Sequence, residues 1–319
     1  STLVFVVYVS VGGMVAITWT DVVQGILMVA VVLGTAAYFM LTAGGPVEVF
    51  QAGLEAAPAL GEAGDRSLVT DLGSFAIWAA AIPVIPHVVM RVYTAKDAHG
   101  ARVSLNLAMI FYCLIILAAT LVIVPMGKTL FPELGDSDQI FLKVMDTQFS
   151  PLVSGLAVAA VLAAVMSTTD ALLLACSSAV AHDLVGNLWG KNLSQKTLGR
   201  INILVVWIIG LIAMGLAFDP PKLITAYYTD AIGALSAGLF VPVVAGLWWR
   251  RANLWGGVAA FSLGVLTYVI LAFEPDIPKR SGILIALPVS FLAMWIGSLL
   301  TAPDYGDMAE SVEALHRDP

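Results

Sequence analysis

Charged residues are scarce in this chain, and their scarcity decides its class. Lysine, arginine, aspartate and glutamate make up 12% of the 319 residues, against about a quarter in soluble proteins. Hydrophobic residues make up 60%, and the mean hydropathy is +0.93. The apolar runs reach the ~20 residues that a helical crossing needs, and they lack the alternation of a membrane β-barrel. The sequence therefore predicts an all-helical protein that crosses a membrane many times.

Several functional signatures are also missing. The formal charge of −7 offers no basic surface for nucleic acid. The sequence has no phosphate-binding loop, no GxSxG elbow and no HExxH metal site. We therefore expect no enzyme activity, no organic cofactor and no nucleic-acid partner. The two cysteines, Cys113 and Cys176, lie within apolar stretches and are interpreted as small buried apolar residues.

Nine apolar stretches are candidate spans. They cover about residues 1–11, 22–43, 73–94, 104–127, 152–181, 201–217, 223–249, 255–273 and 283–301. We expect Gly12 and Gly13 to end the first span before a short connection, residues 14–20. Residues 1–301 are predicted to form one transmembrane domain, and residues 302–319 a polar tail. Lysines and arginines are concentrated in the connections on the side of residues 182–200, which places the C-terminus in the cytoplasm of a cell-membrane protein.

The stretch 152–181 is unusual because Ser167, Thr168 and Asp170 lie near its middle. A carboxylate near the hydrocarbon centre costs at least roughly 2.5 to 3.5 kcal/mol, so it usually marks an ion or substrate path. The hydroxyls admit two interpretations, because they either line that path or bond back to the carbonyl four residues earlier. Together with Asp21, these oxygens suit sodium or a proton better than a transition metal.

A second group of candidates lies in two other stretches. Pro83 and Pro86 should break the span 73–94, because each removes a backbone donor and clashes with the preceding turn. Transporters use such breaks to hold substrates and ions. His87 follows the break as a ligand or a helix-packing group. Tyr228 and Asp230, at the start of 223–249, line a vestibule or anchor the helix at the interface.

Four stretches together resemble the sodium:solute symporter family. They are GGMVAITWTDVVQG (12–25), IPHVVMRVYTAKDAHGAR (85–102), AAVLAAVMSTTDALLLACSSAVAHDL (159–184) and GALSAGLFVPVVAGLWWRRANLWGG (233–257). The last two look most like the pantothenate, monocarboxylate and proline branches. The resemblance implies a LeuT-like core of five plus five helices in inverted repeats. It also implies sodium-coupled symport of a small organic solute by alternating access, with a carboxylate such as pantothenate or a short monocarboxylate as the cargo.

The resemblance also implies roles for single residues. The carbonyl of Ala164 and the oxygens of Ser167 and Thr168 match half of the family's sodium site, on core helix eight. Asp21 matches an acidic residue that helps a second sodium or the inward exit of the ion. Asp170 falls where members with two sodium ions place a hydroxyl, so with Asp21 it binds a cation, shares a proton or forms a structural pair.

The matched motifs imply that the chain begins at core helix four. The partners implied are therefore the lipid bilayer, a small-molecule substrate and the missing N-terminal core helices of the same protein. Two alternatives stay open. One is a transporter-like sensory input domain of a histidine kinase, and the other is a proton-coupled carrier that uses Asp170 or Asp21.

Overall fold

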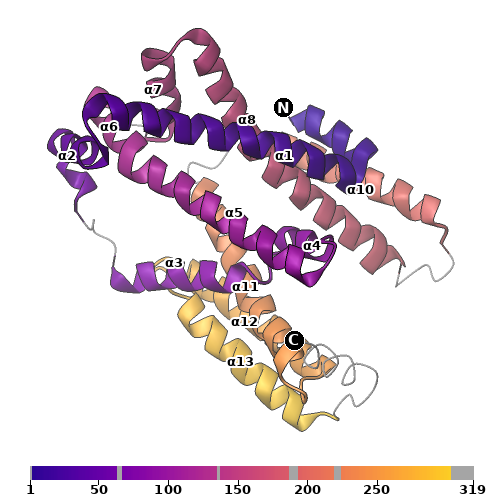
Figure 1. The fold of residues 1–319 in the computed structure, drawn as a ribbon. Coiled ribbons are helices and arrows are strands. Elements are labelled where there is room, and N and C mark those ends of the chain that lie inside the picture. Colours follow the sequence, from indigo (N-terminus) through magenta and orange to yellow (C-terminus); the bar gives the residue numbers. More distant parts are fainter. Residues whose placement is uncertain (1, 63–66, 135–136, 187–192, 219–223, 303–319) are drawn as a thin grey trace. The chain divides into compact units, whose positions relative to one another are not determined.

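The computed structural model describes residues 2–62, 67–134, 137–186, 193–218 and 224–302, and nearly all of them are helical (Figure 1). Within these ranges, eight helical stretches are long and apolar enough to cross a membrane. They are formed by α1 (Thr2–Ala43), α3 (Leu68–Ala81) with α4 (Pro86–Tyr93), α5 (Ala98–Ala118) with α6 (Val124–Leu130), α8 (Pro151–Ser178), α10 (Gln195–Leu216), α11 (Ile224–Trp248), α12 (Leu254–Phe273) and α13 (Ile283–Leu300). The helical residues 2–11 add the short first stretch that the sequence indicates. The predicted polar tail falls almost wholly on residues 303–319, outside the described residues.

Capping side chains set where several of these helices begin. Ser67, Asp97, Ser194 and Asn253 have extended backbones, and each accepts a hydrogen bond from a backbone N–H of the first turn. Such caps satisfy donors that have no partner within the helix. Two π-helical segments, Ala119–Ile123 and Ala179–Gly186, continue α5 and α8 respectively.

A single glycine divides α1. Gly13 has φ 54° and ψ −151°, a conformation that residues with a Cβ rarely adopt. The prediction of a connection over residues 14–20 is wrong, because these residues are helical and the turn is made at Gly13 alone. Asp21 consequently lies about two helical turns inside the second part of α1 instead of at its beginning.

The first compact unit comprises residues Ser1–Gly64 and Thr94–Asp219. Here α1 lies along α8 and also contacts α10 and α5. The short helices α2 (Pro46–Ala56) and α7 (Ile140–Gln148) close the end of α1. A buried cluster that includes Phe39, Val49 and Val144 joins these elements. The outward faces keep many large apolar side chains exposed, as expected of helices that face lipid.

The second compact unit comprises residues Asp65–Tyr93 and Pro220–Pro319. Its described helices are α3, α4, α11, α12 and α13, and α12 packs against both α11 and α13. Small residues permit this packing: a Cβ at Gly264 would overlap the Ala237 carbonyl, and one at Gly256 would overlap Ser298. Close approach at small residues is a main source of helix association in lipid.

Both cysteines are exposed in the described structure. The prediction that Cys113 and Cys176 are buried is therefore wrong. Residues in a membrane span can lie on an exposed face of the helix, so an apolar stretch alone does not predict burial.

Candidate functional site

Three oxygen atoms gather at one point on α8. The hydroxyl of Ser167 donates to the Ala164 carbonyl at 3.1 Å, and the hydroxyl of Thr168 donates to the same carbonyl at 3.4 Å. Helical periodicity brings these atoms together, because positions three and four residues apart share a face. Ser167 is half-buried and Thr168 is exposed, so the group is reachable from one side of the helix. We call Ala164, Ser167 and Thr168 the α8 oxygen cluster.

The hydrogen bonds of the α8 oxygen cluster are compatible with either interpretation of the hydroxyls, and the ion path stays a prediction. Each hydroxyl bonds back to its own helix, as Ser and Thr often do. A hydroxyl that donates its hydrogen still keeps lone pairs that accept a cation. Thr169, in contrast, donates to the Val165 carbonyl at 2.7 Å and takes no part in the cluster. The residues present therefore fit an oxygen-coordinated monovalent cation.

Asp170 lies on a different flank of α8 from this cluster. Its side chain is completely buried, and its Oδ2 accepts a hydrogen bond from the hydroxyl of Tyr8, in the part of α1 before Gly13. A buried carboxylate is costly unless donors surround it. The phenol supplies such a donor from 162 residues away in the sequence.

Asp21 and Thr20 lie near the same phenol. The carboxylates of Asp170 and Asp21 and the side chain of Thr20 all lie near the Tyr8 hydroxyl. The turn at Gly13 makes this possible, because it folds the segment that carries Tyr8 back beside the segment that carries Asp21. The structure thus brings the two predicted carboxylates to one phenol, while the α8 oxygen cluster forms a separate group.

Tyr8 is a residue that sequence reasoning missed. Its signal is a single phenol within the apolar run 1–11, and the sequence pattern indicates only that this run is the end of a span. The pattern alone does not name its partner, because the contact depends on the turn at Gly13 and on the packing of α1 against α8.

The double-proline break is confirmed in the second unit. Helix α3 ends at Ala81 and α4 begins at Pro86, and between them the N–H groups of Val84 and Ile85 both bond to the Ala81 carbonyl. Proline has no N–H, so the carbonyls four residues before Pro83 and Pro86, at Ala79 and Ile82, lose their helical donors. Both prolines are exposed. The break therefore offers backbone acceptors inside a membrane span.

His87 stands in the first turn after the break. Its side chain is half-buried, and its Nδ1 is buried with no hydrogen-bond partner in the part of the chain that the structure describes. A buried ring nitrogen without a partner is costly unless a ligand or water satisfies it. His87 therefore carries an unsatisfied polar atom beside the helix break.

Asp230 and Tyr228 contact other helices of the same unit. The hydroxyl of Tyr268, on α12, donates to Asp230 Oδ1 at 3.4 Å. The ring of Tyr228 lies 6.2 Å from the ring of Trp78, on α3. Tyr268 also packs in a buried cluster with Ala81 beside the helix break.

Sequence reasoning missed Tyr268, although it stands alone as a phenol within the apolar stretch 255–273. It packs so closely on Gly233 that a Cβ there would overlap the tyrosine ring. Asp230 is thus held by a phenol, as Asp170 is in the first unit. In the described ranges, no three His, Cys, Asp or Glu side chains form a potential metal site.

The known proteins that resemble this chain in sequence include several transporters. The osmoregulated proline transporter OpuE of Bacillus subtilis is 28% identical over 308 residues, which are 94% of this chain and 62% of the relative. The sodium/pantothenate symporter of Escherichia coli is 27% identical over 67% of this chain and 44% of the relative. The monocarboxylic acid transporter of Corynebacterium glutamicum is 26% identical over 98% of this chain and 65% of its own length. These relatives confirm the branches that the sequence motifs resemble.

Among solved structures, a Na+-coupled sialic acid symporter in a substrate-bound outward-open state matches with a TM-score of 0.77 and 19% identity. The match covers 95% of this chain and 66% of that one, and it confirms the LeuT-like fold. The chain spans less than two thirds of the length of each of these relatives. The model of the sodium:solute symporter family matches residues 1–264. The chain therefore belongs to the sodium:solute symporter family.

Proposed function

We propose that the protein containing this chain takes up a small organic carboxylate together with sodium by alternating access. The observation that carries the proposal is the α8 oxygen cluster, in which three oxygens meet on one reachable side of a membrane helix. Family membership and the names of the relatives, which include proline, pantothenate and monocarboxylic acid transporters, support a carboxylate cargo. The C-terminus lies on the cytoplasmic side of the cell membrane in this proposal.

Sodium binds at the α8 oxygen cluster, and a core helix that precedes this chain in the complete protein supplies the remaining oxygens. A ligand shifts a conformational equilibrium only by its differential affinity for the two states. Sodium therefore favours the outward-open state if the two helices approach each other in that state alone. When the bundle rocks and the helices separate, the site loses ligands and sodium leaves past Asp21.

The solute binds beside the break between α3 and α4. Backbone amides at the beginning of α4 carry a positive partial charge that attracts a carboxylate, as broken helices do in other transporters. His87 and the acceptors left by Pro83 and Pro86 hold the rest of the solute. Asp230, fixed by Tyr268, lines the path to this position.

Proton coupling is a second candidate. The burial of Asp170, its bond to Tyr8 and the nearness of Asp21 favour it, because a carboxylate in a low-dielectric setting is costly unless a proton or a cation accompanies it. In this case uptake depends on the pH gradient and persists without sodium.

Uptake by the complete protein in proteoliposomes distinguishes these candidates. Ser167→Ala combined with Thr168→Ala should raise the sodium concentration for half-maximal uptake by about tenfold or more, since two ligands are lost. Thr169→Ala is the matched control, because its hydroxyl bonds to Val165 outside the cluster. An unchanged sodium dependence in the double variant rejects the site, and uptake driven by pH alone establishes the second candidate.

A further inference from the structure

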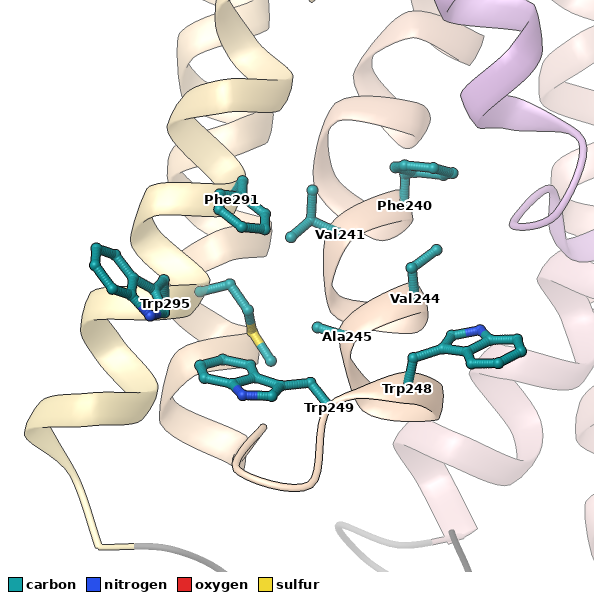
Figure 2. Close-up of a pocket in the computed structure, with 9 residues that line it drawn as sticks. Phe240, Val241, Val244, Ala245, Trp248, Trp249, Phe291 and Trp295 are labelled. Carbon is teal, nitrogen blue, oxygen red and sulfur yellow. The ribbon is translucent and has the colours of Figure 1, made fainter. Parts of the chain in front are cut away.

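An apolar groove lies between α11 and α13 in the second unit, away from the polar residues described above (Figure 2). Its volume is about 550 Å³, within the range of small-molecule binding sites. The lining side chains are aromatic or aliphatic: Phe240, Val241, Val244, Ala245, Trp248, Trp249, Phe291, Met294 and Trp295. Such a lining has few hydrogen-bonding groups for a small polar solute, and it suits a hydrocarbon chain.

The type of aromatic residue changes along the length of the groove. Trp248, Trp249 and Trp295 lie toward the end where α11 finishes, whereas Phe240 and Phe291 lie farther along the helices (Figure 2). Tryptophan is enriched at the membrane–water interface. Phe240 precedes Trp248 by eight residues, roughly 12 Å of helix at 1.5 Å per residue. The groove therefore runs from the interface into the hydrocarbon region.

Positive charge stands at the interfacial end. Arg250 and Arg251 directly follow the tryptophans, and the Nη2 of Arg251 donates to the Leu299 carbonyl at 3.2 Å. Its Nε is buried and has no hydrogen-bond partner within the described ranges. The bond to Leu299 fixes the guanidinium in place, and the planar fork of N–H donors of an arginine suits a phosphate group.

The connection that carries the arginines is fixed in place. The Asn253 side chain donates to the Ser298 carbonyl at 3.3 Å and to the Thr301 hydroxyl at 2.7 Å. Its Oδ1 accepts from the N–H of Gly256 and caps α12, so the positive end of a 20-residue helix lies at the same place. The charged end of the groove is therefore preformed.

We propose that this groove binds an anionic phospholipid, with one acyl chain between α11 and α13 and the phosphate at Arg251 and Arg250. The apolar lining, the interfacial tryptophans and the complementary charge together identify this occupant. Basic pockets between membrane helices bind anionic headgroups in general. The site is independent of the proposed transport function, because it shares no residue with the sodium or solute positions.

Quenching of tryptophan fluorescence by brominated lipids tests the site in the complete protein, purified in mixed micelles. Brominated phosphatidylglycerol should quench the part of the tryptophan fluorescence that Trp295 emits, which is absent in Trp295→Phe. This quenching should require a lower mole fraction of brominated phosphatidylglycerol than of brominated phosphatidylcholine. Arg251→Gln should weaken the phosphatidylglycerol effect about fivefold, the contribution of one basic residue near an anionic headgroup. Arg102→Gln is the control, because Arg102 belongs to the other unit.

A substitution that fills the groove tests the proposal a second time, without changing an arginine. Ala245→Phe places a ring inside the groove and should abolish the quenching of Trp295 by the brominated lipid. Val243→Phe is on the same helix but outside the lining, so it should leave this quenching unchanged. Equal quenching by the two lipids shows only a general lipid shell and overturns the proposal. The same holds if Ala245→Phe has no effect, or if neither lipid reaches Trp295 because protein covers the groove.

Discussion

The hydroxyl of Tyr8 donates a hydrogen bond to the buried carboxylate of Asp170, and the bond ties the first helical segment of the chain to α8. The segment turns at Gly13, and the position of Tyr8 beside Asp170 depends on this turn. A carboxylate in an apolar helix has a large desolvation cost, and the bond from Tyr8 offsets part of it.

Tyr8→Phe should destabilise the first unit by about 1–3 kcal/mol, because a buried acceptor loses its donor. Thermal unfolding in detergent measures the change. Tyr112→Phe is the control, since Tyr112 is exposed on α5. If Tyr8→Phe costs as much in an Asp170→Ala background as in the wild type, the two residues do not interact.

Gly13→Ala should cost of order 1–3 kcal/mol, because alanine must adopt a backbone conformation that is almost restricted to glycine. Gly25→Ala, later in α1, has open space at its Cβ and should stabilise the protein by roughly 0.5–1 kcal/mol. Unfolding temperatures of the two variants give the comparison. Equal effects would mean that the turn does not need a glycine.

Asp170→Asn should leave sodium-driven uptake within a few-fold of the wild type, because the α8 oxygen cluster lies on another flank of the helix. Asparagine keeps an acceptor for Tyr8, so the fold is retained. Uptake is measured against sodium concentration and against pH. Loss of sodium dependence with an unchanged unfolding temperature would place the coupling ion at Asp170 instead.

Pro83→Ala should return a donor to the Ala79 carbonyl and extend α3 into the break. We expect the affinity for the solute to fall about tenfold, because the loss of one good contact costs ~1.4 kcal/mol of binding free energy. Pro288→Ala, which removes a proline from within α13, should leave the affinity unchanged. Uptake over a range of solute concentrations tests the pair, and wild-type affinity in Pro83→Ala would remove the break from the solute site.

The local features follow from the amino-acid sequence alone. Apolar length predicts the membrane helices, and two prolines three residues apart predict the break before α4. Helical periodicity places the oxygens of Ala164, Ser167 and Thr168 on one face, because the atoms belong to neighbouring turns. All of these follow from interactions within a few residues of chain.

The pairing of the polar residues depends on how the helices pack against one another. Tyr8 with Asp170 and Tyr268 with Asp230 join different helices, and neither pairing is encoded by spacing. The first depends on one backbone conformation at Gly13 and on the packing of α1 along α8. Local patterns fix the helices and the faces of their side chains, but only the turns and the packing between helices determine which faces meet.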